Sequence, residues 1–207
     1  MNYNLERKGR NLHYTIFAVN EAYTCMAIGS ADGYLRVMVS PNFLQSQPLK
    51  EYEIHLENQV IKHVKLPNCL NKDINRQSVY YSTQNGIYYI QDIEKNKRGG
   101  LLTHVSPVFC GLNTKGHIIF VNSEEGCIER IDPADRSRET KIFVEGNKQQ
   151  MLVYKDYVIV VYSGKMLSNK SRITMSIINI DIEFTAFQVM VSGVKAIIPA
   201  IDSVFLI

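Results

Sequence analysis

Three segments of this 207-residue chain share one pattern, and that repeat limits the fold more than any other feature. In each segment an apolar stretch is followed by a short polar turn that ends in glycine, and then by a second apolar stretch. The segments are "CMAIGSADGYLRVMV" (25–39), "VYYSTQNGIYYIQDI" (79–93) and "IIFVNSEEGCIERID" (118–132). Their turns recur about every 40 to 50 residues, which is the period expected of propeller blades built from antiparallel strands.

The residues of these turns resemble a possible active site, above all Asp32 between Ala31 and Gly33. Their chemistry is explained more simply by hairpin geometry. Glycine adopts positive φ without steric cost, and Ser, Asp and Asn side chains bond to the local backbone. We therefore predict structural turn residues with no catalytic role. They are Asp32, Gly33, Asn85, Gly86, Glu125 and Gly126.

Further strand patterns follow the same plan. Residues 157–163 and 173–182 are expected to pair across a polar loop, residues 51–56 alternate like a half-buried strand, and residues 194–207 begin another unit. Seven blades would need about 300 residues. The sequence thus predicts an all-β, WD-repeat-like β-propeller that is incomplete, with about four blades and the start of a fifth. We expect a flexible N-terminus at 1–11, a partial propeller at 12–207, and a chain that is a fragment of a longer product.

Patterns for chemistry are weak, so we predict no catalytic, cofactor-binding or metal-binding residue and no enzyme. The four cysteines, at 25, 69, 110 and 127, have no CxxC spacing, and the five histidines, at 13, 55, 63, 104 and 117, have no paired ligand spacing. Gly164-Lys165 lacks the glycine and hydroxyl residue of a phosphate-binding loop. Cys110 has His104 six residues upstream, but no third group is evident to orient that histidine.

Charge is balanced, since 23 basic and 20 acidic residues leave a net charge of +3. Such a charge gives no field strong enough to imply nucleic acid as a partner. The mixed-charge stretches 4–10, 94–100 and 132–141 are expected to be solvated loops. An alternative is that 94–100 and Arg136, Arg138 and Lys141 form a docking surface for an acidic partner.

Four segments in order resemble the vacuolar protein sorting-associated protein 11 family, a core subunit of the HOPS and CORVET tethering complexes. "MAIGSADGYLRV" is similar to that family's "MAIG-x-x-DG-x-V" hairpin, and residues 144–165, "VEGNKQQMLVYKDYVIVVYSGK", are similar to its "FEG-x-K" segment and the strand after it. "SIINIDIEFTAFQ" (176–188) and "VKAIIPAIDSVFLI" (194–207) resemble the strands that follow, although Glu183-Phe184 replaces the family's Asn-Lys.

The resemblance implies a non-catalytic propeller that acts through protein–protein interactions in endosome-to-vacuole or lysosome transport and membrane fusion. The implied partners are the other tethering subunits and, indirectly, Rab-type GTPases and SNAREs, with no direct membrane insertion. The implied location is the cytosolic face of late endosome, vacuole or lysosome membranes. The family's α-solenoid and zinc-binding RING domain have no match in the sequence, so no cofactor is expected for this chain, and no motif identifies partner-binding residues.

Two alternatives stay open at the level of the sequence. The repeats alone fit another propeller scaffold or adaptor of a trafficking or coat complex equally well. A propeller enzyme would need carboxylates or metal ligands converging on inner strands. The acidic residues of the repeats instead fall in or beside turns; they are Asp32, Glu124, Glu125, Asp132 and Asp135.

Overall fold

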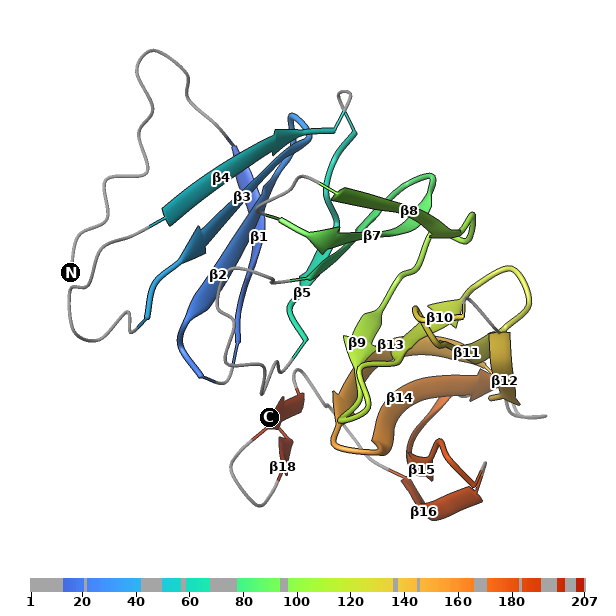
Figure 1. The fold of residues 1–207 in the computed structure, drawn as a ribbon. Coiled ribbons are helices and arrows are strands. Elements are labelled where there is room, and N and C mark those ends of the chain that lie inside the picture. Colours follow the sequence, from blue (N-terminus) through green and yellow to red (C-terminus); the bar gives the residue numbers. More distant parts are fainter. Residues whose placement is uncertain are drawn as a thin grey trace. The chain divides into compact units, whose positions relative to one another are not determined.

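The structure, a computed structural model, is built from antiparallel strands (Figure 1). It describes residues 13–20, 22–41, 50–56, 59–67, 78–93, 97–135, 138–144, 146–165, 171–182, 184–190, 197–199 and 204–206. Within these ranges no helix occurs, and none is present that could span a membrane. The predicted flexible segment 1–11 lies outside the described residues.

The chain divides into two compact units, residues 1–106 and 107–207, and the predicted 12–207 domain extends over both. The first unit contains two four-stranded sheets whose strands follow one another in chain order. The first sheet consists of β1 (Tyr14–Val19), β2 (Cys25–Ser30), β3 (Tyr34–Val39) and β4 (Lys50–His55). The second consists of β5 (His63–Lys65), β6 (Val79–Thr83), β7 (Gly86–Asp92) and β8 (Lys97–Thr103).

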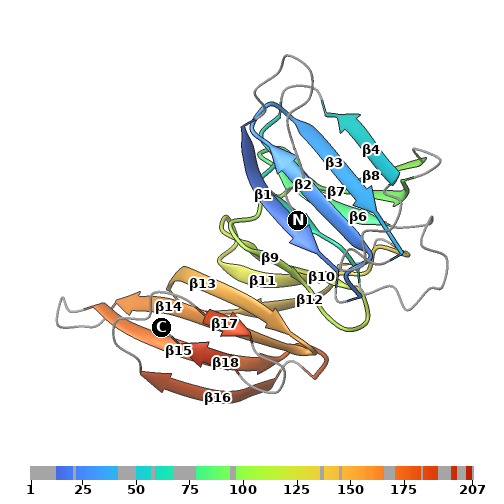
Figure 2. The same ribbon diagram turned by 90° about the vertical axis from the view of Figure 1, so that its left-hand side faces the viewer.

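The second unit repeats this plan twice and then begins it again. Its first sheet consists of β9 (Cys110–Leu112), β10 (Ile118–Asn122), β11 (Cys127–Ile131) and β12 (Arg138–Phe143). Its second consists of β13 (Asn147–Tyr154), β14 (Tyr157–Lys165), β15 (Ser171–Asn179) and β16 (Phe184–Met190), which lie side by side in Figure 2. A two-stranded sheet follows, of β17 (Ile197–Pro199) and β18 (Val204–Leu206).

Within each unit, neighbouring sheets approach one another through their first strands. β1 lies next to β5, β9 next to β13, and β13 next to β17. Four-stranded meanders that adjoin through their first strands are the blade arrangement of a propeller. The fold class predicted from the sequence is therefore confirmed, as an all-β propeller that is incomplete over the described residues.

The predicted hairpins are present as β2–β3, β6–β7 and β10–β11, each paired in antiparallel register. The two predicted later strands pair as β14 and β15, and the strand expected at 51–56 corresponds to β4. The expectation of solvated loops was wrong for parts of two charged stretches. Residues 97–100 belong to β8 and residues 138–141 to β12, because pairing with the apolar neighbours β7 and β11 outweighs a charged composition.

The core of each unit lies between facing sheets. In the first unit, Leu35 and Val37 of the first sheet belong to the same buried cluster as Val79 and Ile90 of the second, and all four are at most 1% exposed. In the second unit, residues of β10 and β11 pack against residues of β14 and β15; the buried members are Ile119, Val121, Ile128, Val144, Val158, Val160, Tyr162, Ile178 and Ile180. Because side chains alternate along a strand, every second residue of a sheet points toward the neighbouring sheet of the same unit.

Two glycines allow adjoining sheets to approach closely. A Cβ at Gly111 in β9 would lie 2.4 Å from Val153 Cγ2 and 2.8 Å from Val153 Cβ in β13. A Cβ at Gly29 in β2 would lie 2.6 Å from Ile61 Cγ2, just before β5. All three distances are shorter than any contact between carbon atoms that packing tolerates. A side chain at either position would therefore force the sheets apart.

Candidate functional site

The six turn residues predicted from the sequence lie at the connections between the second and third strands of three sheets. Between β2 and β3, Gly33 has φ of 79° and its N–H bonds to Ser30 O. Tyr34 N donates to Ser30 Oγ at 2.9 Å, while Asp32 is exposed. Both hydrogen bonds connect residues of this turn to one another.

The next two turns have the same character. Asn85 N donates to Thr83 Oγ1 at 3.1 Å, and Gly86 has φ of 142°. In the third turn, Gly126 has φ of 71°, and Glu125 N donates to Asn122 Oδ1 at 3.2 Å. In this arrangement the six residues shape hairpins; the first four belong to one unit and the last two to the other.

The third turn begins a cluster that the sequence analysis did not identify. The ligand atoms of Glu125, Cys127 and Glu129 lie within 4.8 Å of one another, the one group of this kind in the described residues that could hold a metal ion. Cys127 and Glu129 occupy alternate positions and so share one face of β11, while Glu125 lies in the turn just before the strand. The sequence could have indicated this cluster, because Glu125, Cys127 and Glu129 are every second residue of "EGCIE".

The groups of this cluster already have contacts within the fold. The Lys141 ammonium pairs with Glu125, and Asn122 Nδ2 donates to Glu129 Oε1 at 2.6 Å. Burial raises the pKa of the Cys127 thiol, and the nearby Glu129 and Glu125 carboxylates raise it further. A metal ion would need to displace the Lys141 ammonium from Glu125 and the proton from the Cys127 thiol. The present contacts connect the turn to β10, β11 and β12.

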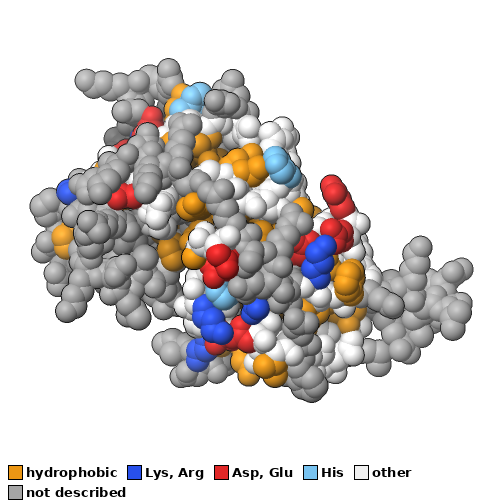
Figure 3. Space-filling model, turned by 45° about the vertical axis from the view of Figure 1, so that its right-hand side comes forward, with side chains coloured by type: hydrophobic (Ala, Val, Ile, Leu, Met, Phe, Trp, Pro, Cys, Tyr) orange, Lys and Arg blue, Asp and Glu red, His pale blue; other side chains and the backbone are white. Residues whose placement is uncertain are grey.

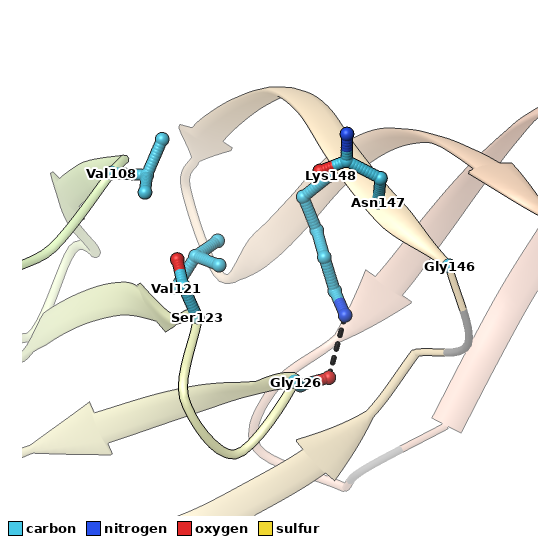
Figure 4. A pocket seen from close by; sticks show the side chains of 7 residues that line it. All are labelled: Val108, Val121, Ser123, Gly126, Gly146, Asn147 and Lys148. Atoms are coloured by element: carbon cyan, nitrogen blue, oxygen red, sulfur yellow. Dashed lines mark hydrogen bonds between the residues drawn. The ribbon is translucent and has the colours of Figure 1, made fainter.

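Lys148 in β13 connects this turn to the next sheet (Figure 4). Its ammonium donates to Gly126 O at 2.6 Å and to Val144 O at 2.5 Å. Burial lowers the pKa of Lys148. The side chain borders a cavity of about 200 Å³ that Val108, among others, also lines. The ammonium thus satisfies two carbonyls at the junction of β10–β11 and β12–β13, which is a structural role.

A second ionic cluster joins loops of the second unit. Asp181 accepts from Lys115 Nζ at 2.5 Å and from Arg130 Nη1 at 2.7 Å. The hydrogen bond from Lys115 lowers the pKa of Asp181, and the positive charges of Lys115 and Arg130 lower it further, whereas burial opposes the shift. His117 Nε2 lies 3.6 Å from Asp132 Oδ2 nearby. Each charge faces an opposite charge, so the cluster stabilises loops and presents no field of one sign.

Histidines of the first unit also have ordinary partners. His55 stacks on Tyr34 with ring centroids 4.4 Å apart, and His63 Nδ1 lies 2.7 Å from Ser82 Oγ. On the face drawn in Figure 3, basic side chains lie beside acidic ones. Of the alternative docking surface for an acidic partner, Lys141 is paired with Glu125. Residues 94–96 and Arg136, and the side chains of 97–99 and Arg138, lie outside what the structure describes.

A larger cavity lies between the last strands of the two sheets of the second unit. Its volume is about 390 Å³, and it is bordered by the end of β12 and by β14, β15 and β16. We call it the β12–β16 groove. Its lining residues are Ile142, Phe143, Val144, Tyr162, Thr174, Ser176, Ile178, Thr185 and Gln188. Sequence reasoning missed this groove, because residues from four strands form it.

The architecture defines the class of protein: the chain is a WD-repeat-like β-propeller. Among solved structures it is similar to Sqt1 of Saccharomyces cerevisiae, with a TM-score of 0.65 and 10% identity over 93% of this chain and 56% of that one. It is similar to a chain of the mitotic checkpoint complex, with a TM-score of 0.62, 10% identity and the same coverage. The chain thus spans about half the length of these structures. No protein-family model matches the sequence, and no curated protein matches it.

Proposed function

We propose that the chain is a non-catalytic interaction scaffold, the propeller of a vesicle-tethering subunit of the HOPS/CORVET type. It belongs, in this proposal, to the vacuolar protein sorting-associated protein 11 family. It acts at the cytosolic face of late endosome, vacuole or lysosome membranes, where transport vesicles dock and fuse. Its partners are the other tethering subunits and, through them, Rab-type GTPases and SNAREs.

One observation supports this proposal most: the four segments that resemble the family coincide with strand pairs. "MAIGSADGYLRV" spans β2 and β3, and residues 144–165 span β13 and β14. Residues 176–188 cover parts of β15 and β16, and residues 194–207 include β17 and β18. Order and spacing thus follow the blades, as expected if the resemblance reflects a shared fold and not chance matches in loops.

The proposal that the chain is no enzyme and needs no cofactor draws on the described carboxylates. Glu125 and Asp181 are held by ammonium or guanidinium groups, and Glu129 accepts from Asn122. A general acid or base needs a carboxylate that can reach a substrate proton. The described carboxylates of these clusters already serve as acceptors within the fold.

Affinity capture tests the tethering function. The full chain, tagged and expressed in cells, should enrich the core subunits of HOPS or CORVET, measured by quantitative mass spectrometry. The control bait is an unrelated WD-repeat propeller with the same tag, since it reports association due to the fold alone. Enrichment equal to that of the control would contradict the proposal.

A second candidate function is that of a propeller scaffold or adaptor in another trafficking or coat complex. The repeated blades favour it equally, and one similar solved chain is part of a multi-protein complex. The same capture experiment separates the two, because coat subunits would then be enriched in place of the tethering core.

A further inference from the structure

We draw no further inference here: the strongest candidate, the side of β1 on which Phe17 and Val19 are exposed, is an apolar face of the first sheet, and nothing in the part of the chain that the structure describes shows what covers it.

Discussion

Replacing Gly111 with alanine places a methyl group where Val153 already lies. The new Cβ would be 2.4 Å from Val153 Cγ2 and 2.8 Å from Val153 Cβ. A change of rotamer can move Cγ2, but the backbone fixes the Cβ of Val153. The first strands of the two sheets must therefore separate. We expect Gly111→Ala to lower the free energy of unfolding by about 2 kcal/mol, within the range of overpacked cores.

An effect on the unfolded chain reduces the loss of stability expected for Gly111→Ala. Alanine reduces the entropy of the unfolded chain and would by itself stabilise the protein by about 0.4–1 kcal/mol. A net loss of about 2 kcal/mol corresponds to a fall of about 4–8 °C in Tm for a chain of this size. Urea denaturation measured at equilibrium gives the free energy, and differential scanning calorimetry gives Tm.

A double-mutant cycle with Val153→Ala tests the cause. Val153→Ala alone should cost about 1 kcal/mol, because it removes two methyl groups from a half-buried site. It also removes the atom at 2.4 Å but keeps the Cβ at 2.8 Å, so Gly111→Ala should cost less in that background and still destabilise the protein. A Gly111→Ala protein as stable as the unmodified one, in either background, would refute close packing of β9 on β13.

Three further predictions concern charges and turns. Lys148→Met leaves two carbonyls unbonded and should lower the free energy of unfolding by about 1–3 kcal/mol in urea denaturation, and an unchanged midpoint would contradict that role. The folded-state pKa of Asp181 is lowered, so its stabilisation is present above the unfolded pKa and is lost as pH falls through the folded value. Asp181→Asn should accordingly cost up to about 1 kcal/mol at neutral pH and little once the pH lies below the lowered pKa of Asp181, and a pH-independent cost would exclude the ion pair with Lys115. Gly33→Val should lower Tm because φ is 79°, whereas Asp32→Ala at an exposed position should change stability by less than about 0.5 kcal/mol, and equal shifts would argue against the turn geometry.

The sequence was sufficient for the features that depend on neighbours along the chain. Alternation of apolar residues and a glycine after a polar turn specify a hairpin such as β2–β3 within about fifteen residues. Recurrence of that hairpin was sufficient for the fold class. The strands β8 and β12 were not predictable in this way. Their charged residues indicate a solvated loop, and they form strands only because they pair with β7 and β11.

Tertiary structure alone decided which residues meet across sheets. Gly111 and Val153 lie far apart in the sequence, with β10, β11 and β12 between them. Their contact nevertheless sets how closely the two sheets pack. Lys148 reaches the carbonyls of two separate turns, and the β12–β16 groove takes residues from four strands. The physical reason is range: turn chemistry and strand alternation act between adjacent residues, whereas packing and desolvation depend on atoms that only the folded chain brings together.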